Sequence, residues 1–448
     1  MRITGSLYHS FIKRHIGKNN LREMLKTVNS KNIDTLINEG INMQSKFKLK
    51  NMFDKKEEIA LNDLKNIMNK NIKNKTYIGM GYTNSILPSV IKRNILENPK
   101  WYTPYTPYQA EISQGRLETQ YNYQEIIKSL TGLPISNSSL LDEGSSASEV
   151  LNMSYLYHKK KRNIFYCSKD IHPQILNILQ NKAKVLNINL IIDDFSNIKL
   201  CNNTIGILFQ YPNTFGNIVV DNKVISEAKD KNIIISCSAD LLSLTKIKSP
   251  YELGCDIAFG TAQQLGIPMW YGGPHPSYLS CNNKLLRLLP GRIVGKSLDV
   301  TNEEVYRLGL QTREQHIKKE KATSNICTAQ ALLANVAAFY TIYHGKEGIE
   351  NISNNIILKT KLISSGLNEL GINNLNDNMF NTIRINYDNE IFQILNENDI
   401  LLRNINNKYL TITIDEATDI NDCLNFLNII KKIKKPLYKE YTIFDIER

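Results

Sequence analysis

An apolar run of strand length, Ile233-Ile234-Ile235-Ser236-Cys237-Ser238-Ala239-Asp240, ends in an acidic residue. Runs of this kind recur between residues 77 and 320, and helical patterns separate them. The other runs are Asn163–Cys167, Leu186–Ile192, Ile205–Gln210 and Asp256–Phe259. Continuous apolar strands are typical of a sheet that is buried on both faces. The alternation therefore predicts an α/β fold with a mainly parallel sheet that helices cover on both sides.

Three regions are expected along the 448 residues, because one hydrophobic core usually serves only ~100–200 residues. Residues 1–70 carry short amphipathic patterns and predict an N-terminal helical arm. Residues 71–345 predict the large α/β domain, and residues 346–448 predict a small α+β domain. The elements expected in this last region are helix 347–370, strand Thr382–Ile385, helix Glu390–Leu395, strand Tyr409–Ile414 and helix Asp422–Ile433.

The composition excludes several classes of protein. A net charge of +12 would suit an anionic polymer, but Lys is spread along the whole chain, which indicates a compositional bias and no nucleic-acid partner. The seven cysteines show no CxxC or CxxH spacing, so neither a disulfide framework nor a metal site is expected. The uncharged segment 324–345 approaches the length of a membrane span, but its polar residues favour a buried helix. No secretion signal is evident, so a cytoplasmic protein without membrane contact is expected.

A large doubly wound domain followed by a small α+β domain is the arrangement of fold type I pyridoxal-phosphate enzymes, although open α/β sheets serve many chemistries. In such an enzyme the strand Asp256–Phe259 should be followed by a lysine, because the cofactor is held through an amine. The following segment carries Gln263, and no lysine lies between Lys248 and Lys284. Glutamine cannot form a Schiff base. The chain is therefore expected to be catalytic only beside a second chain.

Two positions could still contact a cofactor of this kind. Ser145 lies in a loop ahead of a helix expected at 147–158, where free N–H groups favour a phosphate. The alternative is an ordinary capping box formed by Ser146 and Glu149. Asp240 follows a buried strand and could pair with a pyridinium nitrogen, or it could simply cap the helix that begins at Leu241. The sequence leaves both pairs of alternatives open.

Several long motifs are spread along the chain. They are FIKRHIG at 11–17, YIGMGY at 77–82, YTPYQAEISQGR at 105–116, SLLDEG at 139–144, FQYP at 209–212, GGPH at 272–275, PGRIVG at 290–295, LQTREQHI at 310–317 and EKATSNICT at 320–328. These motifs resemble one family, the P-protein of the glycine cleavage system, also called glycine dehydrogenase (decarboxylating or aminomethyl-transferring). The resemblance extends over nearly the whole chain to about residue 430.

The resemblance implies a particular half of that enzyme. Members are long chains with two homologous halves or pairs of separate subunits, and the catalytic half has His-Lys where this chain has Ala262-Gln263. The chain resembles subunit 1, the half without the lysine, and pyridoxal phosphate is expected on subunit 2 in an α2β2 assembly. Glycine and the lipoylated H-protein are the implied substrates. Alternatives are a scaffold or regulatory paralogue and the N-terminal half of a long chain, although the natural-looking end at 441–448 favours a separate subunit.

Fold type I active sites lie at subunit interfaces, so this chain is expected to lend residues to its partner. Tyr105, Tyr108 and Glu111 form the first candidate loop, with aromatic packing as the alternative. Gly272 and Gly273 could bring backbone N–H groups to the partner's cofactor phosphate, or form a plain turn. Arg313, with His316 and Lys321 nearby, could hold the glycine carboxylate or an interface acid, or form a structural salt bridge. The candidates are Tyr105, Tyr108, Glu111 and Arg313 for catalysis, and Gly272, Gly273, Ser145 and Asp240 for cofactor binding.

Overall fold

The computed structural model describes residues 21–40, 56–102, 107, 109–324, 326 and 329–434. The chain divides into two units, residues 1–74 and 75–448. The first unit contains the helices α2 (Leu21–Thr27), α3 (Ile33–Gly40) and α4 (Glu57–Met68). None of these three helices buries a residue. The short helices expected in the N-terminal region are thus confirmed for the described residues.

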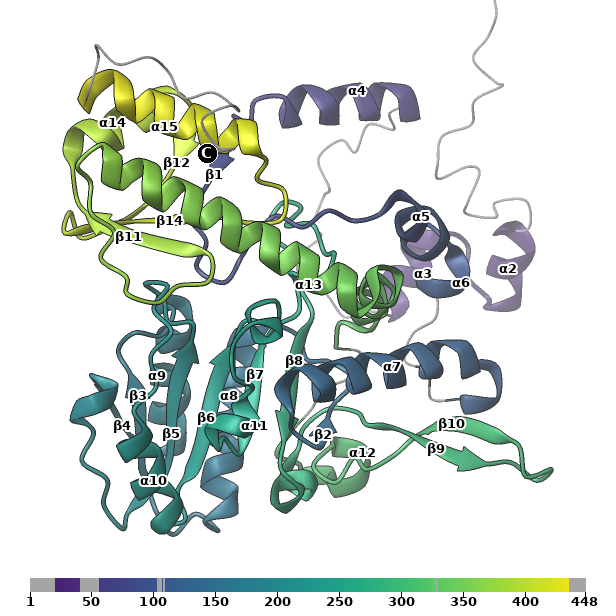
Figure 1. Cartoon of the computed structure of the whole chain (residues 1–448). Coiled ribbons are helices and arrows are strands. Elements are labelled where there is room, and N and C mark those ends of the chain that lie inside the picture. The colour runs from purple at the N-terminus through teal and green to yellow at the C-terminus, as the bar shows by residue number, and fades with distance from the viewer. Residues whose placement is uncertain are drawn as a thin grey trace, which may run out of the picture. The chain divides into compact units, whose positions relative to one another are not determined.

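The second unit is built on a seven-stranded sheet, whose strands run through the teal part of Figure 1. Its strand order is β2-β8-β7-β6-β5-β3-β4. The strands from β7 to β4 are parallel to their neighbours, and β8 and β2 are antiparallel. The bounds are β2 (Ile135–Ser136), β3 (Ile164–Ser168), β4 (Asn189–Asp193), β5 (Thr204–Tyr211), β6 (Ile234–Ala239), β7 (Ile257–Thr261) and β8 (Ser277–Cys281). The predicted mainly parallel sheet is confirmed.

Apolar side chains fill both faces of this sheet, since successive residues of a strand point to opposite sides. In β6, Ile234 packs in one hydrophobic cluster and Ile235 in the other. One cluster is covered by α8 and α9, and the other by α7, α10 and the start of α13. The bounds are α7 (Gln114–Thr131), α8 (Glu143–Tyr157), α9 (Pro173–Leu186), α10 (Asn222–Asp230), α11 (Pro250–Leu253) and α13 (Ala331–Glu369).

Shorter elements surround this core. A hairpin of β9 (Val294–Leu298) and β10 (Glu304–Leu308) packs on α7, where the rings of Tyr121 and Tyr306 lie 5.5 Å apart. The remaining elements are α5 (Ser89–Ile91), the π-helix η1 (Lys92–Leu96), α6 (Pro99–Tyr102), α12 (Gln315–Lys318) and the 3-10 turns η2 (Ala110–Ile112), η3 (Phe195–Asn197), η4 (Ser243–Thr245), η5 (Asn283–Leu288) and η6 (Lys319–Lys321).

Helix α13 joins the sheet region to the small C-terminal part. The helix expected near 324–344 begins only at Ala331, and it continues to Glu369 through a non-helical Gly345 with φ 64°. Val336 packs on the seven-stranded sheet, whereas Ile363 and Leu367 pack in the small C-terminal core. No helix among the described residues is long and apolar enough to cross a membrane.

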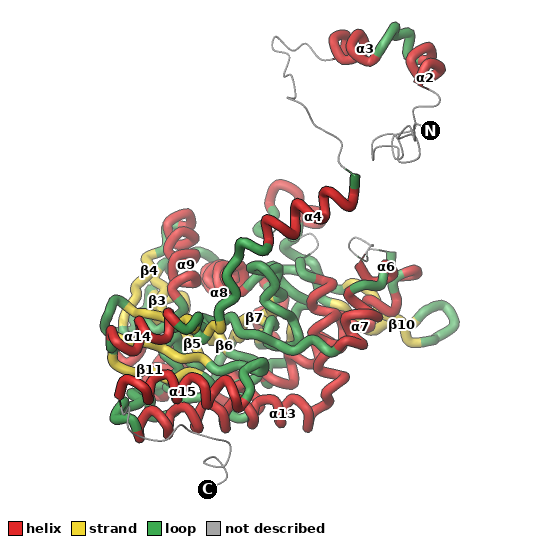
Figure 2. Tube along the Cα trace, turned by 90° about the horizontal axis from the view of Figure 1, so that it is seen from above, coloured by secondary structure: helices red, strands yellow, loops and turns green. Residues whose placement is uncertain are grey.

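The small part has an antiparallel three-stranded sheet in the order β11-β14-β13, and α14, α15 and the C-terminal part of α13 contribute to its hydrophobic core. Figure 2 shows α15 lying beside α13. A second strand pair, β1 with β12, adds residues 75–76 to this part, and Tyr77 enters its core. The chain therefore joins the small part to the large one twice, through residues 77–88 and through α13. The bounds are β1 (Lys75–Thr76), β11 (Thr382–Asn386), β12 (Ile400–Leu401), β13 (Arg403–Ile405), β14 (Tyr409–Thr413), α14 (Asn389–Glu397) and α15 (Ile420–Lys434).

Candidate functional site

A small polar cavity lies where the carboxyl ends of β5, β6 and β7 meet, the edge at which open α/β sheets bind ligands. Its volume is about 50 Å³. Side chains from strand ends, from the start of α8 and from residues 80–83 line it. The residues used below are Thr83, Glu143, His172, Gln210, Ser238, Asp240 and Gln264. No lysine or arginine occurs among the described residues of the lining.

Gln263 lies two residues past β7 and is completely buried. Its amide Nε2 donates to Thr83 O over 2.6 Å, and its Oε1 accepts from Thr83 N over 3.1 Å. The same Nε2 also donates to Ile267 O. One side-chain amide thus pairs with both backbone polar groups of one residue, Thr83. A lysine ammonium carries only donors, so it could not accept from Thr83 N.

His172 is held in one neutral tautomer. Gln210 Oε1 accepts from His172 N over 2.8 Å, which turns the Gln210 NH2 group toward His172 Nε2, 2.8 Å away. Nε2 must therefore accept, and Nδ1 carries the proton and faces Thr214 Oγ1 at 2.9 Å. Burial, with the nearby Arg403 charge, lowers the pKa of His172 to about 3. The His172 imidazole therefore lines the cavity in its neutral form and with a fixed orientation.

Two buried carboxyl groups face the same space. Glu143 Oε1 accepts from Ser238 Oγ over 2.7 Å, and burial raises the pKa of Glu143 to about 7. Asp240 Oδ2 accepts from Gln264 Nε2 over 2.9 Å, and burial raises its pKa as well. Asp240 Oδ1 also accepts from Ser243 N over 2.8 Å. Asp240 therefore lines the cavity and caps the following turn, which supports the capping alternative, and its pairing with a pyridinium nitrogen stays a prediction.

The expected phosphate loop is instead the first turn of a helix. The prediction of a start near residue 147 was wrong, because α8 begins at Glu143 with Asp142 as its N-cap. Asp142 Oδ1 accepts from Ser145 N over 2.7 Å and so occupies the place of an anion. The capping box of Ser146 and Glu149 was also wrong, since Ser146 Oγ lies 2.7 Å from Ser277 Oγ inside the core. A phosphate at Ser145 would face the Asp142 carboxylate, which already accepts the hydrogen bond of the Ser145 N–H.

The cavity does not fit pyridoxal phosphate. Sites for ligands of cofactor size usually enclose ~300–1,000 Å³, whereas this one has about 50 Å³. Gln263 offers no amine, and the Asp142 carboxylate already accepts from the Ser145 N–H that a phosphate would need. The described lining of this cavity therefore does not fit a phosphate-bearing cofactor that is held through an amine.

A family model described as glycine cleavage system P-protein matches residues 13–430. The chain belongs to this family. Among curated P-protein relatives, glycine dehydrogenase (decarboxylating) of Nostoc punctiforme is 42% identical over 428 residues, covering 94% of this chain and 44% of the relative. The mitochondrial glycine dehydrogenase (decarboxylating) of Solanum tuberosum is 45% identical over 82% of this chain and 36% of its own length. The chain spans about half the length of these relatives or less.

Solved structures agree with this membership. A crystal structure of glycine decarboxylase (P-protein) of the glycine cleavage system, in inhibitor-bound form, superposes with a TM-score of 0.83 at 26% identity. It covers 93% of this chain and 98% of the solved chain. A sphingosine-1-phosphate lyase of Burkholderia pseudomallei shares the fold, with a TM-score of 0.62 at 11% identity. The expected likeness to fold type I enzymes is confirmed.

Glu111, Gly272 and Gly273 of this P-protein family member are not among the described residues that line the cavity. Tyr105 and Tyr108 are outside the described residues, and Glu111 is exposed in the turn η2. Gly272 and Gly273 have φ values of 109° and 130°, and a Cβ on Gly272 would meet nothing within 4 Å. The turn is open, so an approaching group could reach the Gly272 backbone.

Arg313 is a buried structural residue of this P-protein family member. Nη2 lies 2.7 Å from Glu149 Oε2 and donates to Thr323 O, while Nε donates to Thr323 Oγ1 and Nη1 to Leu288 O. The arginine side chain is only 5% exposed. This arrangement supports the salt-bridge alternative over a contact with a glycine carboxylate. The side chain of His316 is not described, and Lys321 is exposed.

Sequence reasoning missed the residues that shape the cavity. His172 follows β3 in the segment Asp170-Ile171-His172-Pro173, and a histidine between a strand and a proline-started helix was an available signal. Thr83 carried no such signal, because its partner Gln263 is 180 residues away in the sequence.

Proposed function

We propose that this chain is the lysine-free subunit of a glycine dehydrogenase (decarboxylating), and that a second subunit of the same fold binds pyridoxal phosphate. The observation that carries the proposal is the pairing of Gln263 with Thr83 at the strand end where a fold type I enzyme needs an amine. Family membership supports the activity, and glutamine in place of a lysine at position 263 supports a cofactor that is held by a second chain. The proposed assembly is an α2β2 heterotetramer in the cytoplasm.

The proposed reaction releases CO2 from glycine and transfers the remaining aminomethyl group to the lipoyl arm of the H-protein. One sulfur of the lipoyl disulfide bonds to the aminomethyl carbon and the other becomes a thiol, so the electron pair of the broken C–C bond reduces the disulfide. The cofactor chemistry belongs to the partner. This chain's part is to enclose the partner's site and exclude water.

The turn at Gly272 and Gly273 is the proposed contact with the partner's cofactor phosphate, because a Cβ on Gly272 would meet nothing within 4 Å. Trp270 and Tyr271 beside it are 39% and 85% exposed, which is unusual for large aromatic residues and typical of an interface. Tyr105, Tyr108 and Glu111 remain proposed as the loop lent toward glycine.

Reconstitution tests the proposed function. The chain is mixed with a lysine-bearing subunit of the same family, lipoylated H-protein and pyridoxal phosphate, and the exchange of labelled CO2 into glycine is measured. We expect exchange from the mixture and none from this chain alone. If the lysine-bearing subunit exchanges CO2 into glycine at the same rate with and without this chain, a scaffold or regulatory role would be favoured. Exchange by this chain alone would contradict the proposal.

A further inference from the structure

We propose that Gln263 is a positioning residue, which keeps the segment Thr83–Ile86 bound to both parts of the chain. We call this segment the strap. The strap follows β1 and leads from the small C-terminal part to the sheet region. The inference about the strap rests on this chain alone, whereas its consequence for catalysis rests on the proposed function.

The strap is tied to the sheet region at two points. Gln263 binds both the N–H and the C=O of Thr83. Ser85 Oγ accepts from Gly266 N over 2.9 Å. Both partners come from the loop after β7, where the family's catalytic half has its lysine. The glutamine therefore uses the cofactor position to fasten a backbone segment.

Two carboxylates of the small part hold the rest of the strap. Asp415 Oδ2 accepts from Asn84 N over 2.8 Å and from Asn84 Nδ2 over 2.9 Å. Glu416 Oε2 accepts from Ile86 N over 2.8 Å and lies 2.9 Å from Ser85 Oγ. Every strap residue is thus bound by a side chain or backbone group from a distant part of the sequence.

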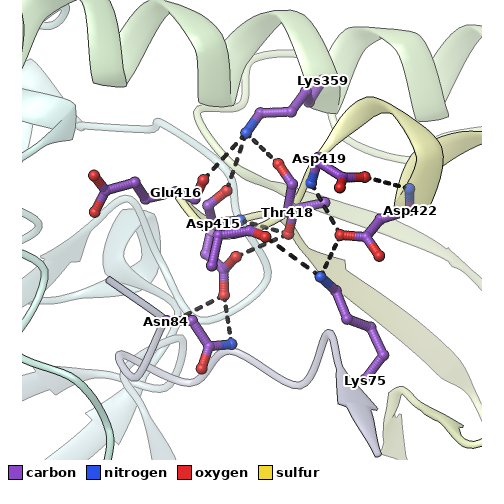
Figure 3. Close-up of polar contacts among 9 residues, drawn as sticks. Lys75, Asn84, Lys359, Asp415, Glu416, Thr418, Asp419 and Asp422 are labelled. Atoms are coloured by element: carbon purple, nitrogen blue, oxygen red, sulfur yellow. Dashed lines mark hydrogen bonds and ion pairs between the residues drawn. The ribbon is translucent and has the colours of Figure 1, made fainter. Parts of the chain in front are cut away.

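The loop that supplies these carboxylates is itself fixed, as Figure 3 shows. Lys359 of α13 reaches the carbonyl oxygens of Asp415, Glu416 and Thr418 with its ammonium group. Thr418 Oγ1 donates to Asp415 Oδ1 over 2.8 Å, so both oxygens of Asp415 are engaged. Burial lowers the pKa of Lys359, consistent with its position inside this loop. The anchor at the small end of the strap is therefore rigid.

The residues just before the strap cover the cavity. A Cβ on Gly81 would lie 3.2 Å from His172 Nε2 and 3.3 Å from Glu143 Oε2, so the backbone rests almost on these two side chains. The ring of Tyr82 lies 5.1 Å from the ring of His275, directly after the Gly272–Gly273 turn. By holding Thr83, Gln263 fixes both the cover of the cavity and the Tyr82–His275 contact beside the proposed partner-facing turn.

Other side chains at this position could not do the same. Lysine leaves Thr83 N without an acceptor, and alanine leaves both groups of Thr83 unpaired. Gln124 is a matched control, because it is also buried and also pairs with both backbone polar groups of one residue. Gln124 Nε2 donates to Val294 O over 2.9 Å, and Gln124 Oε1 accepts from Val294 N over 2.8 Å. Gln124 lies on α7 and touches no strap residue in the described hydrogen bonds.

Hydrogen–deuterium exchange of the full chain tests the strap. We expect Gln263→Ala to speed exchange of the Thr83, Asn84 and Ile86 amides by about tenfold or more relative to amides of β5, because local opening no longer breaks the Gln263 pairing. Gln124→Ala should leave the strap amides at the wild-type rate. Equal strap exchange in wild type and Gln263→Ala overturns the proposal, as does equal acceleration in both variants. If Gln263→Ala does not fold, Gln263→Glu, which keeps the size and the acceptor for Thr83 N but loses the donor to Thr83 O, is measured in the same way.

The reconstituted enzyme supplies the second readout. We expect Gln263→Ala to lower kcat of glycine–CO2 exchange while the Kd between the subunits stays at the wild-type value, and Gln124→Ala to change neither. A fall in subunit affinity alone would overturn the positioning role. If the wild-type mixture shows no glycine–CO2 exchange at all, the proposed function fails. The hydrogen–deuterium exchange of the strap in the isolated chain does not depend on that outcome.

Discussion

The guanidinium of Arg313 and the carboxylate of Glu149 form a buried ion pair, with Nη2 2.7 Å from Oε2. Their side chains are 5% and 14% exposed, and 164 residues separate them in the sequence. Glu149 belongs to α8, and Arg313 follows the β9–β10 hairpin. The ion pair therefore connects the segment after the β9–β10 hairpin to α8, whose first residue, Glu143, lines the cavity.

Removing one member of this pair should destabilise the chain strongly. We expect Glu149→Ala to reduce the free energy of unfolding by about 3–5 kcal/mol, because Arg313 would remain buried without its counter-charge. Urea unfolding followed by circular dichroism measures the loss. The exposed pair Lys296–Glu304, at 2.6 Å, is the control, and Glu304→Ala should leave the unfolding midpoint almost unchanged. Equal losses in the two variants would contradict the structural role of Arg313.

Glu143 should make stability fall as the pH rises. Its pKa is raised from 4.5 to about 7, so between these values the folded state keeps a proton that the unfolded state has lost. Folding is then penalised increasingly from about pH 4.5 to pH 7, and the penalty is complete above pH 7. Glu143→Gln removes this titration and should gain up to about 3 kcal/mol over wild type between pH 4.5 and pH 8. Parallel stability–pH curves for the two proteins would sink the prediction.

His172 should stay neutral far below its ordinary range. Burial and Arg403 lower its pKa to about 3, and Gln210 opposes a proton on Nε2. In a ¹⁵N-histidine NMR titration, the His172 signal is assigned by its absence from the variant His172→Asn. We expect this signal to keep the pattern of a neutral imidazole protonated at Nδ1 down to pH 5. Because the unfolded histidine binds its proton near pH 6.5, this residue removes stability as the pH falls below that value. Titration of this signal near pH 6.5 would show that the network is open.

Substitution of Gly272 tests the proposed contact of this turn with a partner. We expect Gly272→Ala to cost about 1–2 kcal/mol of folding stability through its positive φ, and to lower glycine–CO2 exchange of the two-subunit enzyme beyond that loss. Gly371→Ala is the matched control, since Gly371 has φ 78° and also has open space around a Cβ. It should lose similar stability and keep full exchange. Equal exchange in both variants would argue against a contact at Gly272.

The loop of Tyr105 and Tyr108 is tested in the same assay. We expect Tyr105→Phe and Tyr108→Phe to reduce kcat several-fold without changing the fold, because each removes only a hydroxyl group. Tyr343→Phe, at an exposed tyrosine of α13, should have no effect. Full exchange by the first two variants would mean that this chain lends nothing to catalysis at that loop.

Local patterns predicted most of the elements and few of the contacts. The strands expected at Ile205–Gln210 and Asp256–Phe259 are observed at Thr204–Tyr211 and Ile257–Thr261, because continuous apolar runs have few other ways to be buried. The start of α8 was missed because the residues around Ser145 fit a phosphate-binding loop, whereas the helix already begins at Glu143 with Asp142 as its N-cap. Burial raises the pKa of Glu143 to about 7, and a protonated glutamic acid with Ser238 as partner can be accommodated there.

The sequence by itself determined the fold class, the family and the absence of an amine at position 263. The hydrophobic periods of strands and helices, the family motifs and the residue type at position 263 can all be read from short stretches of neighbouring residues. Only the tertiary structure decided what replaces the amine. Gln263 binds Thr83 across 180 residues, and Asp415 binds Asn84 across 331. Such pairings depend on how the two parts of the chain close on each other, since a buried amide is stable only where a complementary peptide group meets it.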